Sequence, residues 1–141
     1  MRNSLSCAAV LLLGMAVQGA ATGEELAVVV NASAQARAIR SDDLREIFLG
    51  ERHALPDGWK VTPVFLKSGP THDAFLHAYV GKSDGAFRAG WMRLVFTGKD
   101  TLPRTFDSEA ALLDYIAATP EAIGYVRSAG AHPGVKVLAV K

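Results

Sequence analysis

The sequence predicts an α/β domain with three layers and a mostly parallel β-sheet. Segments with the apolar patterns of strands alternate along the chain with segments that repeat apolar residues at helical spacing. The valine-rich run from Glu25 to Asn31 is almost continuously apolar, as expected for a strand that is covered on both faces. Residues 61–79 follow the pattern of a strand, a short polar turn and a helix. Together these observations favour helices packed on both faces of one sheet.

The first part of the domain is expected to supply the centre of the sheet. The strand at residues 25–31 leads into a polar turn that contains Asn31 and Ser33. This turn follows the carboxyl end of the strand, where open α/β sheets tend to bind ligands. Ser41 is expected to cap a short helix that Gly50 stops. The apolar face of this helix consists of Leu44, Ile47 and Phe48.

The middle of the chain is expected to add a second strand and two helices. Residues 51–59 form a loop that returns to the strand and helix of residues 61–79. Ser83 or Asp84 can cap the helix that follows. Arg88 falls outside the apolar stripe of that helix and is expected to face solvent, as is Arg93. The stripe itself consists of Phe87, Trp91, Leu94 and Val95.

The last third of the chain is expected to form one helix and two strands. Residues 104–106 are predicted as a short extended piece, after which Asp107 or Ser108 begins a helix that ends before Pro120. The inward face of this helix consists of Leu112, Leu113, Tyr115 and Ile116. The final strands are predicted at residues 122–126 and 135–140, with a glycine-rich turn between them.

The polar turn between the second strand and its helix is a candidate anion-binding site. A strand that ends at a glycine-containing turn and continues into a helix leaves backbone N–H groups unpaired, and the helix dipole favours negative charge there. Ser68, Gly69, Pro70 and Thr71 form this turn. In an alternative interpretation, Thr71 only caps the helix and Pro70 only fixes the turn.

Residues 1–21 have the features of a signal peptide. Arg2 supplies a positive charge, residues 8–17 are apolar but too short to span a bilayer, and residues 19–21 are small enough for signal-peptidase cleavage. Cys7 precedes the apolar segment and is expected to leave with the signal peptide. We therefore expect residues 22–141 to form one exported, cysteine-free domain in the periplasm.

Charge and motifs exclude several classes of function. The chain has 15 basic and 14 acidic residues, a balance that argues against nucleic acid as a partner. The triplet at residues 81–83 lacks the upstream glycine and the preceding strand of a phosphate-binding loop. His72 and His77 are five residues apart, so they diverge on a helix and cannot share a metal. The sequence contains no nucleophile elbow and no glycosidase acid pair, and we expect no metal, no cofactor and no catalysis.

Three motifs occur in order along the chain. They are LREIFLG at residues 44–50, VTPVFLKSGPTHDAF at residues 61–75 and AIGYV at residues 122–126, followed by a closing VKVLAV strand. Together they resemble the phosphate-type periplasmic substrate-binding proteins of ABC transporters. The likeness covers nearly all of residues 22–141. It implies a non-enzymatic protein that binds phosphate or a similar oxyanion for a membrane transporter or sensor.

The resemblance also implies which residues bind the ligand. In that family, the amides and hydroxyls of a Ser-Gly-Thr turn hold the oxyanion, and an arginine follows the threonine. Here Pro70 is inserted into the turn, which removes one N–H donor, and a histidine that is only partly charged at neutral pH replaces the arginine. The candidate ligand-binding residues are Ser68, Gly69, Thr71 and His72, together with Asn31 and Ser33, which are included only because they lie at a strand end.

Members of the family have two lobes that close on the ligand, whereas this chain is long enough for one, so we expect a small single-lobe relative. Two hypotheses follow. In the first, an oxyanion binds at residues 68–72, either weakly or at the interface of a homodimer, because a single lobe leaves the anion exposed to water. In the second, the fold is an envelope protein-interaction module that contacts a transporter or sensor and has no small ligand.

Overall fold

The computed structural model describes residues 25–127 and 132–141. The predicted signal peptide at residues 1–21, which includes Cys7, lies outside the described residues, as do residues 128–131 of the predicted glycine-rich turn. Within the two described ranges, no helix is both long enough and apolar enough to cross a lipid bilayer.

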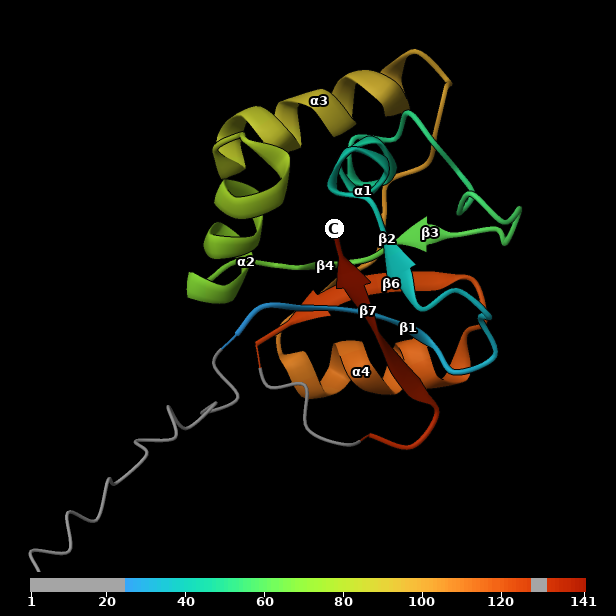
Figure 1. Ribbon diagram of the computed structural model, residues 1–141. Coiled ribbons are helices and arrows are strands. Elements are labelled where there is room, and N and C mark those ends of the chain that lie inside the picture. The colour runs from blue at the N-terminus through green and yellow to red at the C-terminus, as the bar shows by residue number, and fades with distance from the viewer. Residues whose placement is uncertain (1–24, 128–131) are drawn as a thin grey trace, which may run out of the picture.

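The described residues form a five-stranded sheet with β1 at its centre (Figure 1). Val28, Val29 and Val30 of β1 are buried, which confirms the prediction of a central strand covered on both faces. The short strand β2 was not predicted. The strand order is β2 (Ala38–Ile39), β7 (Val135–Val140), β1 (Ala27–Asn31), β6 (Ala122–Val126) and β3 (Thr62–Pro63).

The sheet is mixed, so the prediction of a mostly parallel sheet is partly wrong. β1 runs antiparallel to both β6 and β7, whereas β2 is parallel to β7 and β3 is parallel to β6. The apolar run in β1 shows that both of its faces are buried, but burial does not determine the direction of the neighbouring strands. β6 and β7 follow each other in sequence and nevertheless lie on opposite sides of β1.

The second predicted strand is divided between two sheets. After β3, the chain forms β4 (Phe65–Leu66), which pairs in parallel with β5 (Thr105–Phe106). The change occurs at Val64, whose N–H donates to the carbonyl of Ile123 in β6 at 2.9 Å. The next N–H, of Phe65, donates to the carbonyl of Arg104 at 3.0 Å. The chain therefore leaves the main sheet at this point and is held by β5 as it approaches the candidate turn.

Helices cover both faces of the main sheet (Figure 1). α4 (Glu109–Ala118) packs under β1 and β6, while α1 (Ser41–Phe48) and α3 (Asp84–Phe96) lie on the other side. α2 (Pro70–Phe75) continues without a break into the π-helix η1 (Leu76–Val80). This arrangement confirms the prediction of a single α/β lobe with three layers.

Serine side chains cap α3 and α4: of the predicted alternatives, the structure has Ser83 in place of Asp84 and Ser108 in place of Asp107. The hydroxyl of Ser83 accepts a hydrogen bond from the N–H of Ala86 at 3.2 Å, and Ser108 does the same in α4 at 3.1 Å. The predicted cap at Ser41 is wrong: Ser41 is the first residue of α1, and no described side chain caps that helix. Its backbone N–H instead donates to the carbonyl of Lys141 at 3.0 Å, so the end of β7 holds the start of α1.

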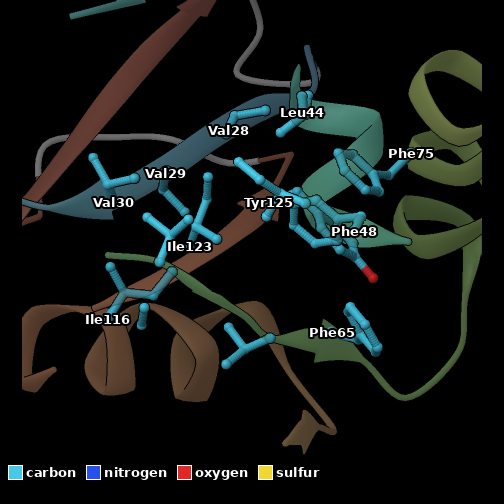
Figure 2. Close-up of a cluster of buried hydrophobic side chains, with 14 of the residues drawn as sticks. Val28, Val29, Val30, Leu44, Phe48, Phe65, Phe75, Ile116, Ile123 and Tyr125 are labelled. Carbon is cyan, nitrogen blue, oxygen red and sulfur yellow. The ribbon is translucent and has the colours of Figure 1, made fainter. Parts of the chain in front are cut away.

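An aromatic cluster forms the part of the core that supports α1 and α2 (Figure 2). The rings of Phe75 and Tyr125 stack with centroids 4.0 Å apart, and Phe48 meets Phe75 edge to face at 4.7 Å. Phe65 extends the cluster toward α3. On the other side of the sheet, Ile116 of α4 packs beneath the valines of β1. The candidate turn is thus attached to one end of a tightly packed core.

Candidate functional site

The candidate turn joins β4 to α2. The N–H of Lys67 donates to the carbonyl of Phe106 at 2.8 Å, which fixes the chain as it leaves β4. Gly69 has φ 109° and ψ 175°, a conformation that residues with a Cβ rarely adopt. α2 then begins at Pro70, as the turn sequence predicts. Thr71 lies inside the first turn of α2, where no described side chain caps the helix, so the alternative in which Thr71 is the cap is wrong.

The turn contains hydrogen-bond donors that the fold does not use. The first helical hydrogen bond of α2 runs from the N–H of Asp73 to the carbonyl of Gly69 at 3.0 Å, so the earlier N–H groups have no intrahelical partner. Within residues 25–127 and 132–141, no acceptor meets the N–H groups of Ser68, Gly69, Thr71 and His72, and the hydroxyls of Ser68 and Thr71 form no hydrogen bond. Ser68 is exposed and Thr71 is half-buried. These donors are available to a ligand.

The side chain of His72 lies in the core. Its Nε2 lies 2.8 Å from Oδ1 of Asp84, and its Nδ1 contacts the hydroxyl of Tyr125. Because a carboxylate only accepts hydrogen bonds, we assign a proton to Nε2 and a hydrogen bond from Tyr125 O–H to Nδ1. The Tyr125 oxygen in turn accepts the N–H of Leu66 at 3.0 Å. Each polar atom of this chain of groups has a partner, as buried polar groups require.

Because its ring is buried, His72 offers the turn its backbone N–H instead of its side chain. The resemblance places His72 where the family has an arginine, but its ring is 1% exposed and both of its nitrogens are occupied by Tyr125 and Asp84. The backbone N–H of His72 stays among the unused donors of the turn. Through these two contacts, the ring connects the start of α2 to Tyr125 of β6 and Asp84 of α3.

Asp84 is shared between His72 and Arg88. The Nε of Arg88 donates to Oδ1 and Oδ2 of Asp84 at 2.9 and 3.0 Å, and its Nη2 donates to the carbonyl of Lys67. Burial alone would raise the pKa of Asp84, but the hydrogen bonds from Arg88 and His72 outweigh burial and hold that pKa below its usual value. Burial raises the pKa of the Tyr125 phenol, which therefore stays protonated at neutral pH.

The lowered pKa of Asp84 predicts an acid-sensitive fold. In the unfolded chain the carboxylate titrates near the ordinary value of 3.8, so its contribution to stability is present above that pH and is lost as pH falls through the lower pKa of the folded state. We expect the unfolding free energy of Asp84→Asn to depend less on pH between about 4 and 2 than that of the unmodified protein. Urea titrations at a series of pH values measure this, and identical pH profiles would contradict it.

Asn31 and Ser33 do not lie with the other candidate residues. β1 is antiparallel to β6, and β3 is parallel to β6, so the carboxyl end of β1 lies at the opposite end of the sheet from the turn after β4. The Nδ2 of Asn31 donates to the carbonyls of Ile116 and Ala117 at 2.8 and 3.1 Å. Its Oδ1 accepts the N–H of Ser33 at 2.9 Å. The buried Asn31 side chain thus donates to two carbonyls in the last turn of α4, and the Ile116 carbonyl also accepts the N–H of Thr119 at 3.2 Å.

Surface cavities lie near the turn but do not include it. Four cavities have linings made of described residues, among others, and Ser68, Gly69 and Thr71 line none of these four. The nearest of these, which we call the α3 groove, has a volume of about 280 Å³. It was not predicted, because the apolar stripe of α3 has the pattern of a fully core-facing surface. The α3 groove is lined by Phe65, Lys67, His72, Phe87, Arg88, Trp91, Met92, Leu102, Pro103 and Thr105.

Metal binding finds no support in the described part of the chain. Among the residues that the structure describes, no group of three or more His, Cys, Asp or Glu side chains is placed to hold a metal ion. His53 lies 3.0 Å from Asp100 and His132 lies 3.2 Å from Asp114, each as a single pair on the surface.

Neither a protein-family model nor a curated protein matches the chain, but solved structures do. An ABC-type phosphate transport receptor from Vibrio cholerae matches with a TM-score of 0.61 and 14% identity. A substrate-binding protein of a phosphate ABC transporter from Clostridium perfringens, with bound phosphate, matches with a TM-score of 0.62 and 15% identity. PstS from Borrelia burgdorferi matches with a TM-score of 0.57 and 14% identity. The matches cover 82% of this chain and 45%, 44% and 47% of those chains, respectively.

These similarities confirm the predicted fold, which is that of the phosphate-type periplasmic binding proteins. This chain spans less than half the length of the proteins that it matches. At 14–15% identity, the comparisons show the fold alone, because one fold can carry many functions.

Proposed function

We propose that this protein is an exported, non-enzymatic solute-binding lobe that holds phosphate or a similar oxyanion at residues 68–72. In this proposal, residues 1–21 are a signal peptide, the protein acts in the periplasm without a cofactor, and it serves an ABC transporter or a membrane sensor. The observation that carries the proposal is the set of unused donors at the start of α2, where backbone N–H groups and the hydroxyls of Ser68 and Thr71 are free to bind an anion.

The fold supports this choice of ligand. The similar proteins are described as phosphate receptors or phosphate-binding proteins, and the one from Clostridium perfringens contains phosphate. Oxyanions suit a turn of this kind because each oxygen accepts several N–H or O–H groups at once. The positive charge nearest to the turn comes from Lys67 and Arg88, of which Arg88 donates to the Lys67 carbonyl.

The exposure of the turn favours weak binding by a single copy. Ser68 is exposed, and water competes for the hydrogen bonds that an anion would make there. A homodimer that covers the turn would exclude that water and strengthen the site. Sedimentation velocity with and without phosphate measures whether such a dimer forms.

The Ser68→Ala, Thr71→Ala double variant tests the site. It removes two hydroxyl donors, each worth about 0.5–1.5 kcal/mol, so we expect affinity for phosphate to fall about tenfold or more. Isothermal titration calorimetry with phosphate, sulfate and small carboxylates measures the loss. Ser68 is exposed, Thr71 is half-buried, and neither side chain forms a described hydrogen bond, so the thermal unfolding temperature should stay nearly unchanged.

Ser33→Ala is the matched control for this experiment. Ser33 is an exposed serine in a turn at the other end of the sheet, and its replacement should leave anion affinity unchanged. The proposal is abandoned if the unmodified protein shows neither heat nor a thermal shift with any of these anions at concentrations of about 10 mM, which corresponds to binding weaker than about −3 kcal/mol.

A protein-interaction module on the same fold is the second candidate function. Phe96, on the outer face of α3, is 81% exposed, and large exposed apolar side chains often mark contact surfaces. In this alternative the protein contacts a transporter or sensor and has no small ligand. Absence of anion binding, together with loss of the contact in a Phe96→Ser variant, would favour it.

A further inference from the structure

The α3 groove has the lining of a small-molecule site. The aromatic rings of Phe65, Phe87 and Trp91 form its apolar wall, and Phe87 and Trp91 meet Phe65 edge to face at 4.8 and 5.6 Å between centroids. Met92 and Leu102 flank this wall and are 41% and 61% exposed. A volume of about 280 Å³, mainly apolar with few polar groups, is at the lower end of the range for ligand pockets.

The polar side of the groove adjoins the candidate turn. Lys67 lines the groove and immediately precedes Ser68 in the chain. Arg88 also lines the groove and donates to the Lys67 carbonyl. His72 is among the lining residues of the groove, and its backbone N–H belongs to the turn. A ligand whose charged group binds at the turn therefore has the groove directly beside it.

The charges that line the groove favour an anion. Lys67 and Arg88 line it, and no carboxylate among the described residues does so. Arg88 is paired with Asp84, but the 3.6 Å pair of Lys67 and Asp107 has side chains that are 65% and 85% exposed, where ion pairs contribute little. The cavity of about 640 Å³ beside η1 is lined by the carboxylates of Asp73 and Asp84 as well as by Lys82, so its charges do not favour an anion.

We propose that the oxyanion bound at the turn is organic, with an apolar body of the size of one aromatic ring that lies in the α3 groove. Aryl phosphonates and aryl carboxylates have this chemistry. The inference rests on the proposed function, because the same turn binds the charged group. Inorganic phosphate would use the donors of the turn but would leave the exposed apolar side chains of Met92 and Leu102 in contact with water, whereas a ring in the groove would cover them.

Binding of phenylphosphonate, methylphosphonate and inorganic phosphate to the purified protein tests this inference. The two phosphonates share the charged group and differ in the ring, so we expect phenylphosphonate to bind at least tenfold more tightly than methylphosphonate. Calorimetry gives the affinities. In ¹H–¹⁵N NMR spectra, the indole signal of Trp91 should shift with phenylphosphonate, and that of Trp59, which hydrogen-bonds Pro120 away from the groove, should not.

A variant that fills the groove separates its contribution from that of the turn. Met92→Trp places a larger side chain at a partly exposed position of the groove. It should bring the affinity for phenylphosphonate close to that for methylphosphonate without changing the latter. Val137→Trp is the control, since Val137 is 47% exposed on β7 and does not line the α3 groove.

The possible outcomes distinguish the two proposals. Equal affinities for the two phosphonates would overturn the inference and leave the proposed function in place. Phenylphosphonate binding that Met92→Trp abolishes but the Ser68→Ala, Thr71→Ala variant does not weaken would overturn the link between groove and turn. Failure of all three anions to bind would overturn the proposed function and, with it, the inference.

Discussion

Replacing Phe48 by alanine is expected to lower the free energy of unfolding by about 3–5 kcal/mol, the usual cost of removing a buried phenylalanine ring. Phe48 is fully buried at the end of α1 and contacts the rings of Phe65, Phe75 and Tyr125 (Figure 2). These partners come from β4, α2 and β6, so the cavity left by the substitution would open between three elements that cannot all close it.

Urea-induced unfolding followed by circular dichroism measures this loss. Phe96→Ala is the matched control, because Phe96 is 81% exposed and its replacement should change stability by no more than about 0.5 kcal/mol. If Phe48→Ala were to cost no more than Phe96→Ala, the aromatic cluster would not be the centre of the core.

Replacing His72 by leucine is expected to cost about 2–4 kcal/mol of stability, because an unpaired buried polar group costs about 1–3 kcal/mol and the new side chain fits the site imperfectly. The Tyr125 hydroxyl would lose its acceptor in the core, and Asp84 would lose one of its donors. The hydrogen bond from Leu66 to Tyr125 would stay in place, so the strand itself should keep its position.

Two further variants test this explanation for His72. His77→Leu changes an exposed histidine in η1 and should leave stability within about 0.5 kcal/mol of the unmodified protein. Tyr125→Phe removes the hydroxyl from the same chain of hydrogen bonds. If His72 and Tyr125 stabilise the fold as one hydrogen-bonded unit, the double variant His72→Leu, Tyr125→Phe should lose less stability than the sum of the losses in the two single variants.

The elements that depend on local patterns could be predicted from the sequence. The buried faces of α1 and α4 follow from apolar residues at helical spacing, and Ser83 and Ser108 are caps because their side chains act within one turn of the chain. The central place of β1 follows from its continuous apolar run. Each of these features is determined by residues that are close together in sequence.

The features that the sequence did not reveal depend on residues that are far apart in it. The direction of β1 relative to its neighbours, and the transfer of the chain at Val64 from β6 to β5, are set by pairing with the last third of the chain. The two residues of β2 are too few to form a pattern. Asn31 pairs carbonyls 85 and 86 positions away, which a polar residue after a strand cannot indicate by itself.

The candidate site depends both on local sequence patterns and on contacts between residues that are far apart in the sequence. The start of α2 at Pro70 and the unused donors around Gly69 follow from the turn sequence alone. The inward position of His72 does not, because its ring partners, Asp84 and Tyr125, lie 12 and 53 residues further along the chain. The α3 groove likewise arises only where β4, α3 and the segment before β5 meet.

The passage of the chain from one sheet to the other at Val64 would affect the affinity of the proposed anion site. Hydrogen bonds fix the backbone of the turn at both ends, to the carbonyl of Phe106 in β5 before it and through the first hydrogen bond of α2 after it. Arg88 also donates to the carbonyl of Lys67. Donors that are already immobile lose little conformational freedom when a ligand arrives. At the proposed anion site, preorganisation of this kind would offset part of the disadvantage of an open, hydrated surface.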